Sequence, residues 1–416
     1  MTQEEALFRR MITQAYHESK HGKAEGTGKE TPLIRLVDMM IQKAIDLNAS
    51  DLHIEPGEKG VRLRFRCDGL LREDSQILPK ELVPLIVSRL KVMAGMDIAK
   101  HQVPQDGHIS YQKDDVKMDI RVSSLPVKEG EVMVLRLMNL EEKMLSLDEL
   151  GFTGENLAAF RSLIRCPSGM NIVVGPVNSG KSTTLYAALA ELRSVEANIV
   201  SLEDPVERHM EGVNQVQVNE KTGLDYLQGL KALLRQDVDK ILLGEIRDAE
   251  TAEMAVRIAL TGHLLMTTMH TENATAAVFR MLEMGVPAYL LAAVLTGVVA
   301  QRLVRRICPH CKETYEVDAG SPEASLLGEN WQSGLELWHG NGCEHCGGSG
   351  YLGRIALHEV LLVTPAMREA ILAHTDRAAL QKQAEKDGLR TLWQDGLVKV
   401  MAGKTDLREI KRVIYG

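Results

Sequence analysis

The sequence predicts an α/β protein built from several domains, and three observations support this prediction. The chain has 416 residues, which is too long for one compact core, so about two to four domains are expected. From about residue 151 onward, short apolar runs alternate with helical patterns, which is typical of a mostly parallel sheet. One glycine-rich stretch lies between such a run and a helix, and the remaining motifs are organised around it: Gly175-Pro176-Val177-Asn178-Ser179-Gly180-Lys181-Ser182.

This stretch fits G-x-x-x-x-G-K-[ST], the pattern of a phosphate-binding loop. Leu185, Leu189 and Leu192 recur on one face of the helix that begins at Lys181. A strand, a loop and a helix N-terminus direct backbone N–H groups at one point, which favours a polyphosphate. Lys181 would contact the β- and γ-phosphates, and the Ser182 hydroxyl would ligate Mg²⁺. We therefore predict a nucleoside triphosphatase core that binds ATP through Gly175, Pro176, Val177, Asn178, Ser179, Gly180, Lys181, Ser182 and Thr183.

Composition and charge limit the class of protein. The apolar fraction of 44% and the charged fraction of 25% are those of an ordinary soluble globular protein. The formal net charge of -8 argues against bulk nucleic-acid binding. The N-terminus has no basic region followed by an apolar run, and the longest apolar run, Val286–Ala300, is shorter than the roughly 20 residues that span a bilayer. A cytoplasmic protein is expected.

An α+β domain is expected over residues 31–138, preceded by a short helix and a flexible lead-in over residues 1–30. The domain opens with a helix that has Thr31-Pro32 as cap and first turn, and a hairpin follows. Three arginines share one face of the second hairpin strand: Arg62, Arg64 and Arg66. They indicate either an anionic partner or an ordinary solvated strand face.

Two further strands are expected at residues 117–123 and 131–138, before a linker over residues 139–150. Arg121 alternates normally within the first of these strands. Arg136 shares a face with Val132 and Val134, where the alternation predicts an apolar residue. A charge on an apolar face needs a partner, which would be a phosphate or a local acid.

Residues 151–306 are expected to form the domain that carries the phosphate-binding loop, and acids follow two of its strands. Glu203 and Asp204 follow residues 199–202, and Glu245 follows residues 240–244. In a parallel sheet these strand ends lie at the edge that also carries the loop, where phosphoryl transfer needs carboxylates to orient water and hold Mg²⁺. Gly244 would leave room for a close ligand, whereas Asp248 is expected to cap the next helix.

Two histidines accompany the strand expected at residues 263–268, one at its first residue and one just after its end. His263 and His270 are seven positions apart, a spacing that sends their side chains to opposite faces of a strand, so a joint metal site is not expected. Two interpretations remain open: one of the histidines senses a phosphate, or it is a buried histidine whose hydrogen bonds are satisfied within the protein.

Two C-x-x-C knuckles predict a structural zinc site over residues 307–350, with Cys308, Cys311, Cys343 and Cys346 as ligands. A disulfide framework and a nucleic-acid-binding zinc ribbon are the alternatives, the latter because of the neighbouring basic residues Arg302, Arg305, Arg306 and Lys312. The loop between the knuckles is longer than the 15–20 residues of common zinc ribbons, which makes the ribbon the less favoured interpretation. Cys67 and Cys166 are expected to be buried thiols. Residues 351–416 are expected to form a C-terminal helical subdomain, helical from Pro365 to the end.

Together these motifs resemble one family, the hexameric secretion ATPases of type II secretion and type IV pilus assembly. The resemblance covers roughly residues 31–416. The segments that carry it are Ser50–Pro56, Asp119–Pro126, the phosphate-binding loop, Leu202–Glu207 (similar to an Asp box), Gly244–Asp248 (similar to an atypical Walker B motif), Thr261–Thr271 (similar to a His box) and Gln301–Cys308.

The resemblance implies a RecA-like P-loop ATPase core with a preceding α+β domain, a four-cysteine zinc subdomain and a C-terminal helical subdomain. It implies that Glu245, with Glu203, positions or activates the attacking water, and that His263 or His270 reads the γ-phosphate. The loop departs from the family's usual sequence because Val177 and Asn178 replace Thr and Gly. Asn tolerates a left-handed backbone, so the loop is expected to survive.

The resemblance also implies that Arg121 and Arg136 complete the site as the domains close. It implies a homohexamer at the inner membrane, peripherally associated, that uses ATP, Mg²⁺ and Zn²⁺ and moves a polytopic platform protein. A motor of the same fold for DNA uptake through a pseudopilus is an alternative, and a nucleic-acid-stimulated zinc-ribbon ATPase is another. The acidic net charge and the lack of aromatic residues near the basic cluster count against the last, so no direct nucleic acid is expected.

Overall fold

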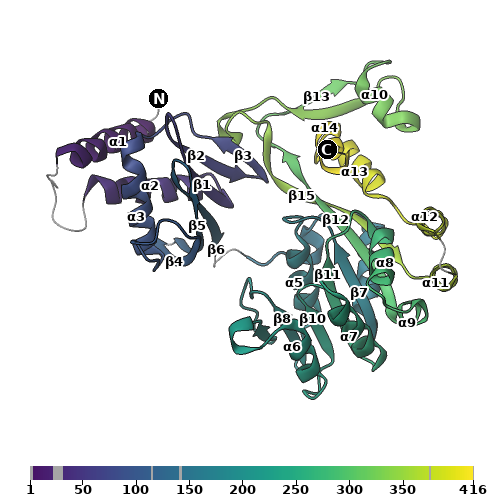
Figure 1. Cartoon of the computed structure of the whole chain (residues 1–416). Helices are drawn as coiled ribbons and strands as arrows, with labels where there is room; N and C mark the ends of the chain where they lie inside the picture. The colour runs from purple at the N-terminus through teal and green to yellow at the C-terminus, as the bar shows by residue number, and fades with distance from the viewer. Residues whose placement is uncertain (1–2, 22–30, 114–115, 140–142, 374–375, 416) are drawn as a thin grey trace. The chain divides into compact units, whose positions relative to one another are not determined.

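The computed structural model describes residues 3–21, 31–113, 116–139, 143–373 and 376–415 (Figure 1). The chain divides into two compact units, Met1–Lys143 and Met144–Gly416. In the described residues, no helix is both long enough and apolar enough to span a membrane.

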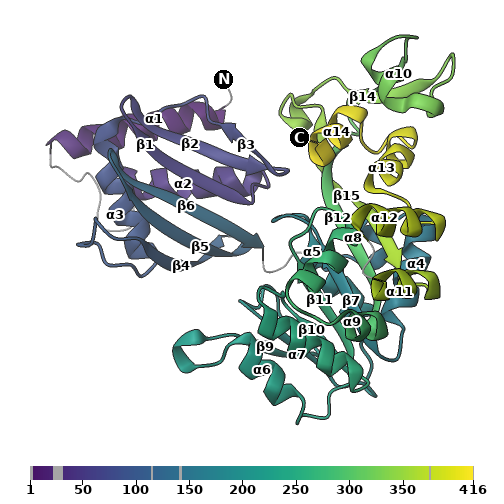
Figure 2. The ribbon, with the colours of Figure 1, turned by 45° about the vertical axis from the view of Figure 1, so that its right-hand side comes forward.

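The N-terminal unit is an antiparallel six-stranded sheet with the order β3-β2-β1-β6-β5-β4. The described α-helices of this unit lie on one side of the sheet and close an apolar core with it (Figures 1 and 2). The element bounds are α1 Gln3–His21, α2 Pro32–Asp46, β1 Asp51–Gly57, β2 Gly60–Cys67, β3 Leu70–Glu73, α3 Val83–Met93, β4 Gln105–Lys113, β5 Val116–Val127 and β6 Gly130–Asn139.

Helix α1 is longer than the short helix expected within residues 1–30. Phe8, Met11 and Ala15 recur at helical spacing and are buried in the core of the N-terminal unit. The first part of the expected lead-in is therefore a packed helix, because its apolar stripe finds a partner in α2. Residues 22–30, where the flexible part was expected, lie outside the described residues.

The arginines of β2 are paired with acids of the neighbouring strand β1. Arg62 and Arg64 bond to Glu55, with Arg62 Nη2 at 3.3 Å from Oε2 and Arg64 Nε at 3.1 Å from Oε1. Arg66 Nε lies 3.4 Å from a carboxylate oxygen of Asp51. The register of the β1–β2 pair places these charges side by side, so the arginines need no anionic ligand to be satisfied.

The alternation assigned to β6 was wrong about which face is apolar. Its buried face carries Glu131, Met133, Leu135 and Leu137, so Arg136 lies on the open face. There Arg136 Nε donates to Asp51 Oδ1 at 3.2 Å, which makes the partner a local acid. Arg121 of β5 is the Cα partner of Arg136 on the same open face, and the structure gives Arg121 no ion pair to a described residue.

The C-terminal unit contains a seven-stranded sheet with the order β15-β12-β7-β11-β10-β8-β9. All neighbours are parallel except β15, which is antiparallel to β12, so the predicted parallel sheet is confirmed. Val173 of β7 joins one apolar core, whereas Ile172 and Val174 join the core on the opposite face. The sheet is therefore buried on both sides, as its continuous apolar strands predict.

The elements of this unit follow in chain order (Figure 1). The strands are β7 Gly169–Val174, β8 Ile199–Glu203, β9 Asn214–Gln217, β10 Lys240–Leu243, β11 Leu264–Met269, β12 Leu295–Ile307, β13 Lys312–Glu316, β14 Glu336–Gly340 and β15 Tyr351–Leu362. The α-helices are α4 Gly154–Ile164, α5 Lys181–Leu192, α6 Tyr226–Leu233, α7 Ala249–Leu260, α8 Ala274–Glu283, α9 Ala288–Val294, α10 Pro322–Leu327, α11 Pro365–Leu372, α12 Arg377–Lys386, α13 Leu392–Met401 and α14 Leu407–Tyr415.

The region expected to be a C-terminal helical subdomain begins with a strand. Residues 351–362 form β15 of the main sheet, paired along most of its length with β12, and the helices start at Pro365. Since β15 pairs with a strand distant in sequence, local patterns did not reveal it. Between β12 and β15, the small β13–β14 sheet and the two cysteine knuckles project from the main sheet.

Candidate active site and cysteine cluster

The phosphate-binding loop has the expected strand–loop–helix geometry. All six residues of β7 are buried, and α5 begins at Lys181 directly after the loop. Asn178 has φ +63° and Gly180 has φ +86°, so both adopt the left-handed conformation. The expectation that Asn178 tolerates this backbone is confirmed, because Asn is one of the few residues with a side chain that visit it routinely.

Lys181 lies within the curve of the loop. Its Nζ donates to the carbonyl oxygens of Gly175 and Pro176, both at 3.0 Å, and the residue is 9% exposed. Burial lowers the pKa of Lys181, while the carboxylate of Glu245 acts in the opposite direction. At the start of the same helix, Ser182 Oγ donates to Glu207 Oε1 at 3.2 Å. An ammonium and a hydroxyl therefore stand at the helix N-terminus, where a phosphate and its cation are favoured.

Glu203, at the end of β8, is 6% exposed and surrounded by protein donors. Its carboxylate accepts hydrogen bonds from the hydroxyls of Tyr186 and Ser201 and, at 3.4 Å, from Gln215 Nε2. Burial, and after it the bond to Glu203, raises the pKa of Tyr186. The structure thus holds Glu203 firmly beside α5, and its predicted part in catalysis stays a prediction.

Glu245 is the centre of a charged cluster at the carboxyl edge of the sheet. It follows β10, its side chain is 18% exposed, and Arg247 Nε donates to its Oε1 at 2.6 Å. His270 Nε2 lies 3.3 Å from Glu245 Oε2, and Arg247 reaches Asp204 at 3.7 Å. The carboxylate is therefore flanked by a guanidinium and an imidazole and remains partly open to solvent, as a group that orients water must be.

Gly244 does not leave room for a ligand, contrary to the expectation. A Cβ at this position would lie 2.8 Å from the hydroxyl oxygen of Tyr226, so the space is filled by the protein itself. Tyr226 comes from α6, an element that the local sequence around Gly244 does not reveal. Asp248 caps α7 as expected, because its Oδ1 accepts from the Thr251 N–H at 2.8 Å.

The two histidines lie at opposite ends of β11. His270 follows the carboxyl end, beside Glu245, whereas His263 precedes the strand. His263 Nδ1 is 3.0 Å from Thr261 Oγ1 and 3.2 Å from the Ile258 carbonyl. It lines an open cleft of about 660 Å³ with Lys240 and Cys166 at the other sheet edge. Within this chain, the expectation that His263 could read the γ-phosphate is corrected, and His270 is the histidine near the loop's edge.

Sequence reasoning missed three side chains of this region: Tyr186, Arg247 and Gln301. Gln301 of β12 is 2% exposed and contacts the loop directly. Its signal was a polar residue interrupting the apolar run of a buried strand. Arg302 follows it, bonds to the carbonyls of Gln301 and Glu272, and belongs to β12 rather than to an exposed basic cluster.

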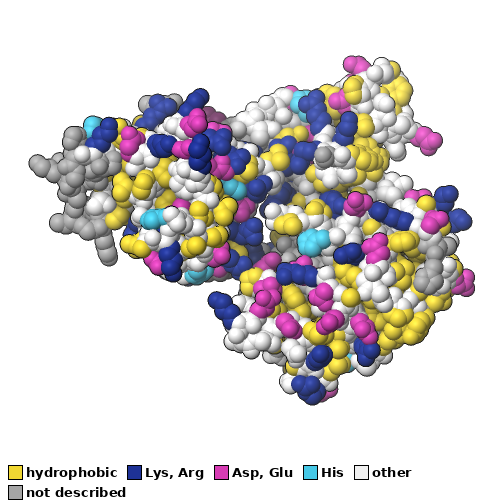
Figure 3. All heavy atoms as spheres, in the orientation of Figure 1, with side chains coloured by type: hydrophobic (Ala, Val, Ile, Leu, Met, Phe, Trp, Pro, Cys, Tyr) yellow, Lys and Arg dark blue, Asp and Glu magenta, His cyan; other side chains and the backbone are white. Residues whose placement is uncertain are grey.

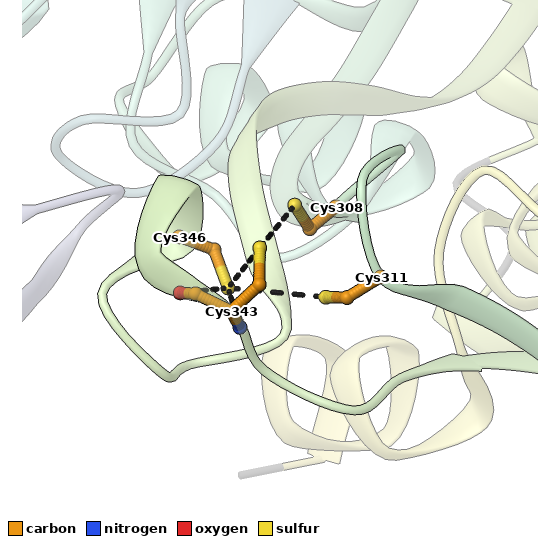
Figure 4. A group of neighbouring side chains, drawn as sticks. All are labelled: Cys308, Cys311, Cys343 and Cys346. Atoms are coloured by element: carbon orange, nitrogen blue, oxygen red, sulfur yellow. Dashed lines mark hydrogen bonds between the residues drawn. The ribbon is translucent and has the colours of Figure 1, made fainter.

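The four knuckle cysteines converge in space (Figure 4). The Sγ atoms of Cys308 and Cys343 are 3.8 Å apart, those of Cys311 and Cys346 are 3.9 Å apart, and those of Cys343 and Cys346 are 3.8 Å apart. Four sulfurs bound tetrahedrally at about 2.3 Å from zinc lie about 3.8 Å from one another. All described cysteines are free thiols, so the disulfide alternative is excluded for them.

Backbone donors support the cluster. The N–H groups of Cys343 and Gly350 lie 3.1 and 3.2 Å from Cys346 Sγ, and the Gly342 N–H lies 3.3 Å from Cys311 Sγ. Such bonds favour thiolates, the form in which cysteine binds a metal. Of the two remaining cysteines, Cys67 is buried as expected and Cys166 is half-buried.

On the face shown in Figure 3, acidic and basic side chains are interspersed over the lower part of the C-terminal unit, over α6 and α7. This mixed surface is not the continuous basic stripe that bulk nucleic-acid binding requires.

Comparisons with known proteins agree with this geometry. The chain matches the family model described as "Type II/IV secretion system protein" over residues 27–412. It is 46% identical over 387 residues to the type II secretion system ATPase E of Vibrio cholerae, covering 92% of this chain and 76% of that protein. It is 42% identical over 395 residues to the type IV pilus assembly ATPase PilB of Pseudomonas aeruginosa, covering 94% of this chain and 69% of that protein.

Among solved structures, the ATPase DotB of Legionella pneumophila has the same fold. The TM-score is 0.66 at 18% sequence identity, and the match covers 94% of this chain and 97% of that one. The family match and the identity to the curated relatives each extend over both units and over the loop, the acids and the cysteine knuckles. The chain therefore belongs to the type II/IV secretion system protein family.

Proposed function

We propose that this chain is the ATP-hydrolysing subunit of a motor that powers type IV pilus assembly or type II protein secretion. The observation that carries the proposal is the phosphate-binding loop with Lys181 inside its curve. The loop follows β7 and Glu245 follows β10, two strands of the same parallel sheet. The two relatives that match this chain over most of their length, at 46% and 42% identity, are named as ATPases of these two systems.

Each residue of the site has a proposed role in ATP hydrolysis. Lys181 would neutralise charge on the β- and γ-phosphates of ATP, and the Ser182 hydroxyl would hold Mg²⁺, which supplies positive charge to the phosphate oxygens. Glu245, with Glu203, would position the attacking water. His270 Nε2 lies 3.3 Å from Glu245 Oε2. His270 would sense the γ-phosphate, because a phosphate bound beside Glu245 places negative charge near the imidazole.

Arg121 and Arg136 are proposed to complete the site from the N-terminal unit. They are paired across β5 and β6 on the open face of that sheet, so both are accessible to a ligand. Positive charge at the transferring phosphoryl group stabilises its transition state. A homohexamer is proposed as the assembled form, on the cytoplasmic side of the inner membrane with a polytopic platform protein as partner. Light scattering of the purified chain tests the hexamer.

Zn²⁺ is proposed to occupy the four-cysteine cluster, as a closed structural site. The spacing of the sulfurs and the backbone N–H bonds to them support this assignment. The site would fix the two knuckles to each other at the end of β12.

Lys181→Ala tests the proposed activity. Turnover of ATP by the purified variant should fall by about 10²–10³, because a contact made to the transferring phosphoryl group is lost. Lys240→Ala is the matched control: it removes a lysine that bonds to a carbonyl, that of Leu192, at the other edge of the same sheet. The control should hydrolyse ATP as the wild type does. Near wild-type turnover in Lys181→Ala would refute the assignment of the loop.

A further inference from the structure

Gln301 joins the phosphate-binding loop to a strand that is distant in sequence. Its Nε2 donates to the Ser179 carbonyl oxygen at 2.8 Å, and its Oε1 accepts from Thr184 Oγ1 at 2.7 Å. All three residues are buried, with 2% exposure for Gln301, 3% for Ser179 and none for Thr184. Since the Ser179 carbonyl oxygen can only accept a hydrogen bond, the amide has one orientation, in which its NH₂ group faces the loop and Oε1 accepts from the Thr184 hydroxyl.

Two of the loop's glycines are required by the approach of Gln301. A Cβ on Gly180 would lie 2.8 Å from Gln301 Nε2, and a Cβ on Gly175 would lie 2.5 Å from the Gln301 carbonyl oxygen. Both distances are shorter than a real Cβ contact permits. The glycine positions of the motif thus reflect the presence of this side chain and its backbone, in addition to the positive φ of Gly180.

The hydrogen bond to Ser179 has a consequence for the other side of the same peptide. The peptide unit is planar and trans, so its C=O and N–H bonds point in opposite directions. When Gln301 holds the Ser179 carbonyl toward β12, the N–H of Gly180 is directed the other way, away from β12. Gly180 caps the first turn of α5, so this N–H belongs to the group of helix N-terminal donors that an anion uses.

We propose that Gln301 is a positioning residue that fixes the direction of the Gly180 N–H for the polyphosphate of the nucleotide. Gln301 acts through the loop and contacts no phosphate itself. The inference rests on the proposed function, because it requires that the loop binds nucleotide. It predicts an effect on both ATP and ADP, since each presents the phosphates that the loop encloses.

Gln301→Leu should weaken the affinity for ATP and for ADP equally, by about tenfold, which corresponds to about 1.4 kcal/mol. Affinity is measured by calorimetric titration at a temperature at which each variant is folded. Asn171→Leu is the matched control, because the Asn171 amide also donates to a carbonyl, that of Leu163 at 2.9 Å, and accepts from a threonine hydroxyl, that of Thr296 at 2.6 Å. It should lower the melting temperature to a similar extent and leave both affinities within about twofold of wild type.

Thr184 gives a second test that leaves Gln301 in place. Thr184→Val removes the hydroxyl that donates to the amide oxygen of Gln301 and should weaken nucleotide binding by about threefold, whereas Thr184→Ser keeps a hydroxyl there and should bind nucleotide as the wild type does. Wild-type affinity in Gln301→Leu, or equal losses in Gln301→Leu and Asn171→Leu, would overturn the inference. If Lys181→Ala loses activity while Gln301→Leu binds normally, this inference fails and the proposed function stands. If the wild-type chain binds no nucleotide, both fail.

Discussion

Glu409 of α14 stabilises the C-terminal unit through a charged contact at the end of β12. Its side chain is 2% exposed and accepts from Arg305 Nη2 at 2.6 Å and from Arg412 Nη2 at 2.7 Å. The backbone N–H of Arg305 donates to it as well, at 3.1 Å. We expect Glu409→Gln to remove both ion pairs, to leave Arg305 half-buried without its anion, and to keep the loop intact.

The magnitude follows from the pKa of Glu409. Burial opposes ionisation, but the bonds from Arg412 and Arg305 outweigh it and lower the pKa from 4.5 to about 2. At about 1.4 kcal/mol per pKa unit, the ionised carboxylate stabilises the folded state by about 3 kcal/mol at neutral pH. Because the folded-state pKa is the lower one, this stabilisation is complete above pH 4.5 and is lost as the pH falls toward 2. By the same relation it is about 2 kcal/mol at pH 3.5.

The assay is unfolding in urea at pH 7.5, 5.5 and 3.5, with thermal unfolding at pH 7.5. The melting temperature of Glu409→Gln should be lower by about 6–12 °C, at about 2–4 °C per kcal/mol. Glu253→Gln is the control, because Glu253 forms an exposed ion pair with Arg257 that is worth less than about 0.5 kcal/mol. The reasoning is refuted if Glu409→Gln is no less stable than Glu253→Gln, or if the difference from wild type stays constant down to pH 3.5.

Four further outcomes are expected. Glu245→Gln should retain ATP affinity and lose about 10²–10⁴ in turnover, since the amide cannot serve as the carboxylate that orients water; a parallel fall in affinity would make Glu245 a binding residue. Glu203→Gln should lower the melting temperature as well as turnover, because its carboxylate is buried among protein donors; unchanged stability would contradict that placement. Cys343→Ser should reduce a zinc content of about one per chain and lower the melting temperature, and zinc-free wild-type protein of full stability would exclude the metal. Arg121→Ala and Arg136→Ala should each lose turnover with little loss of ATP affinity, and normal turnover in both would show that the N-terminal unit does not complete the site.

Short-range rules account for what could be predicted. The loop, the cap at Asp248 and the left-handed backbone of Asn178 each depend on residues within a few positions of one another. Their geometry could therefore be predicted from the local sequence. The parallel sheet follows from the alternation of strands and helices. The cysteine cluster follows from the knuckle spacing, because C-x-x-C turns place two sulfurs on one side of a tight turn.

Predictions failed where a side chain's environment comes from another part of the chain. Period-2 alternation divides the side chains of β6 between two faces but does not say which face is buried. Arg136 was therefore expected on an apolar face. It lies on the open face instead and pairs with Asp51, 85 residues away. The space beside Gly244 is filled by Tyr226, and β15 pairs with β12 across the cysteine knuckles. His263 and His270 could be assigned to the two ends of β11 from the sequence, but the contact of His270 with Glu245 depends on the pairing of β11 with β10.

The sequence by itself determined which residues are the candidates for the chemistry: the loop with Lys181, the acids at the strand ends and the four cysteines. Only the tertiary structure decided which of them meet, and which supporting residues hold them there. Gln301 reaches Ser179 across 122 residues, a distance over which no local periodicity carries information. Such contacts are set by the order and register of the strands. Order and register depend on the packing of the whole sheet, because neighbouring strands come from parts of the chain that are distant in sequence.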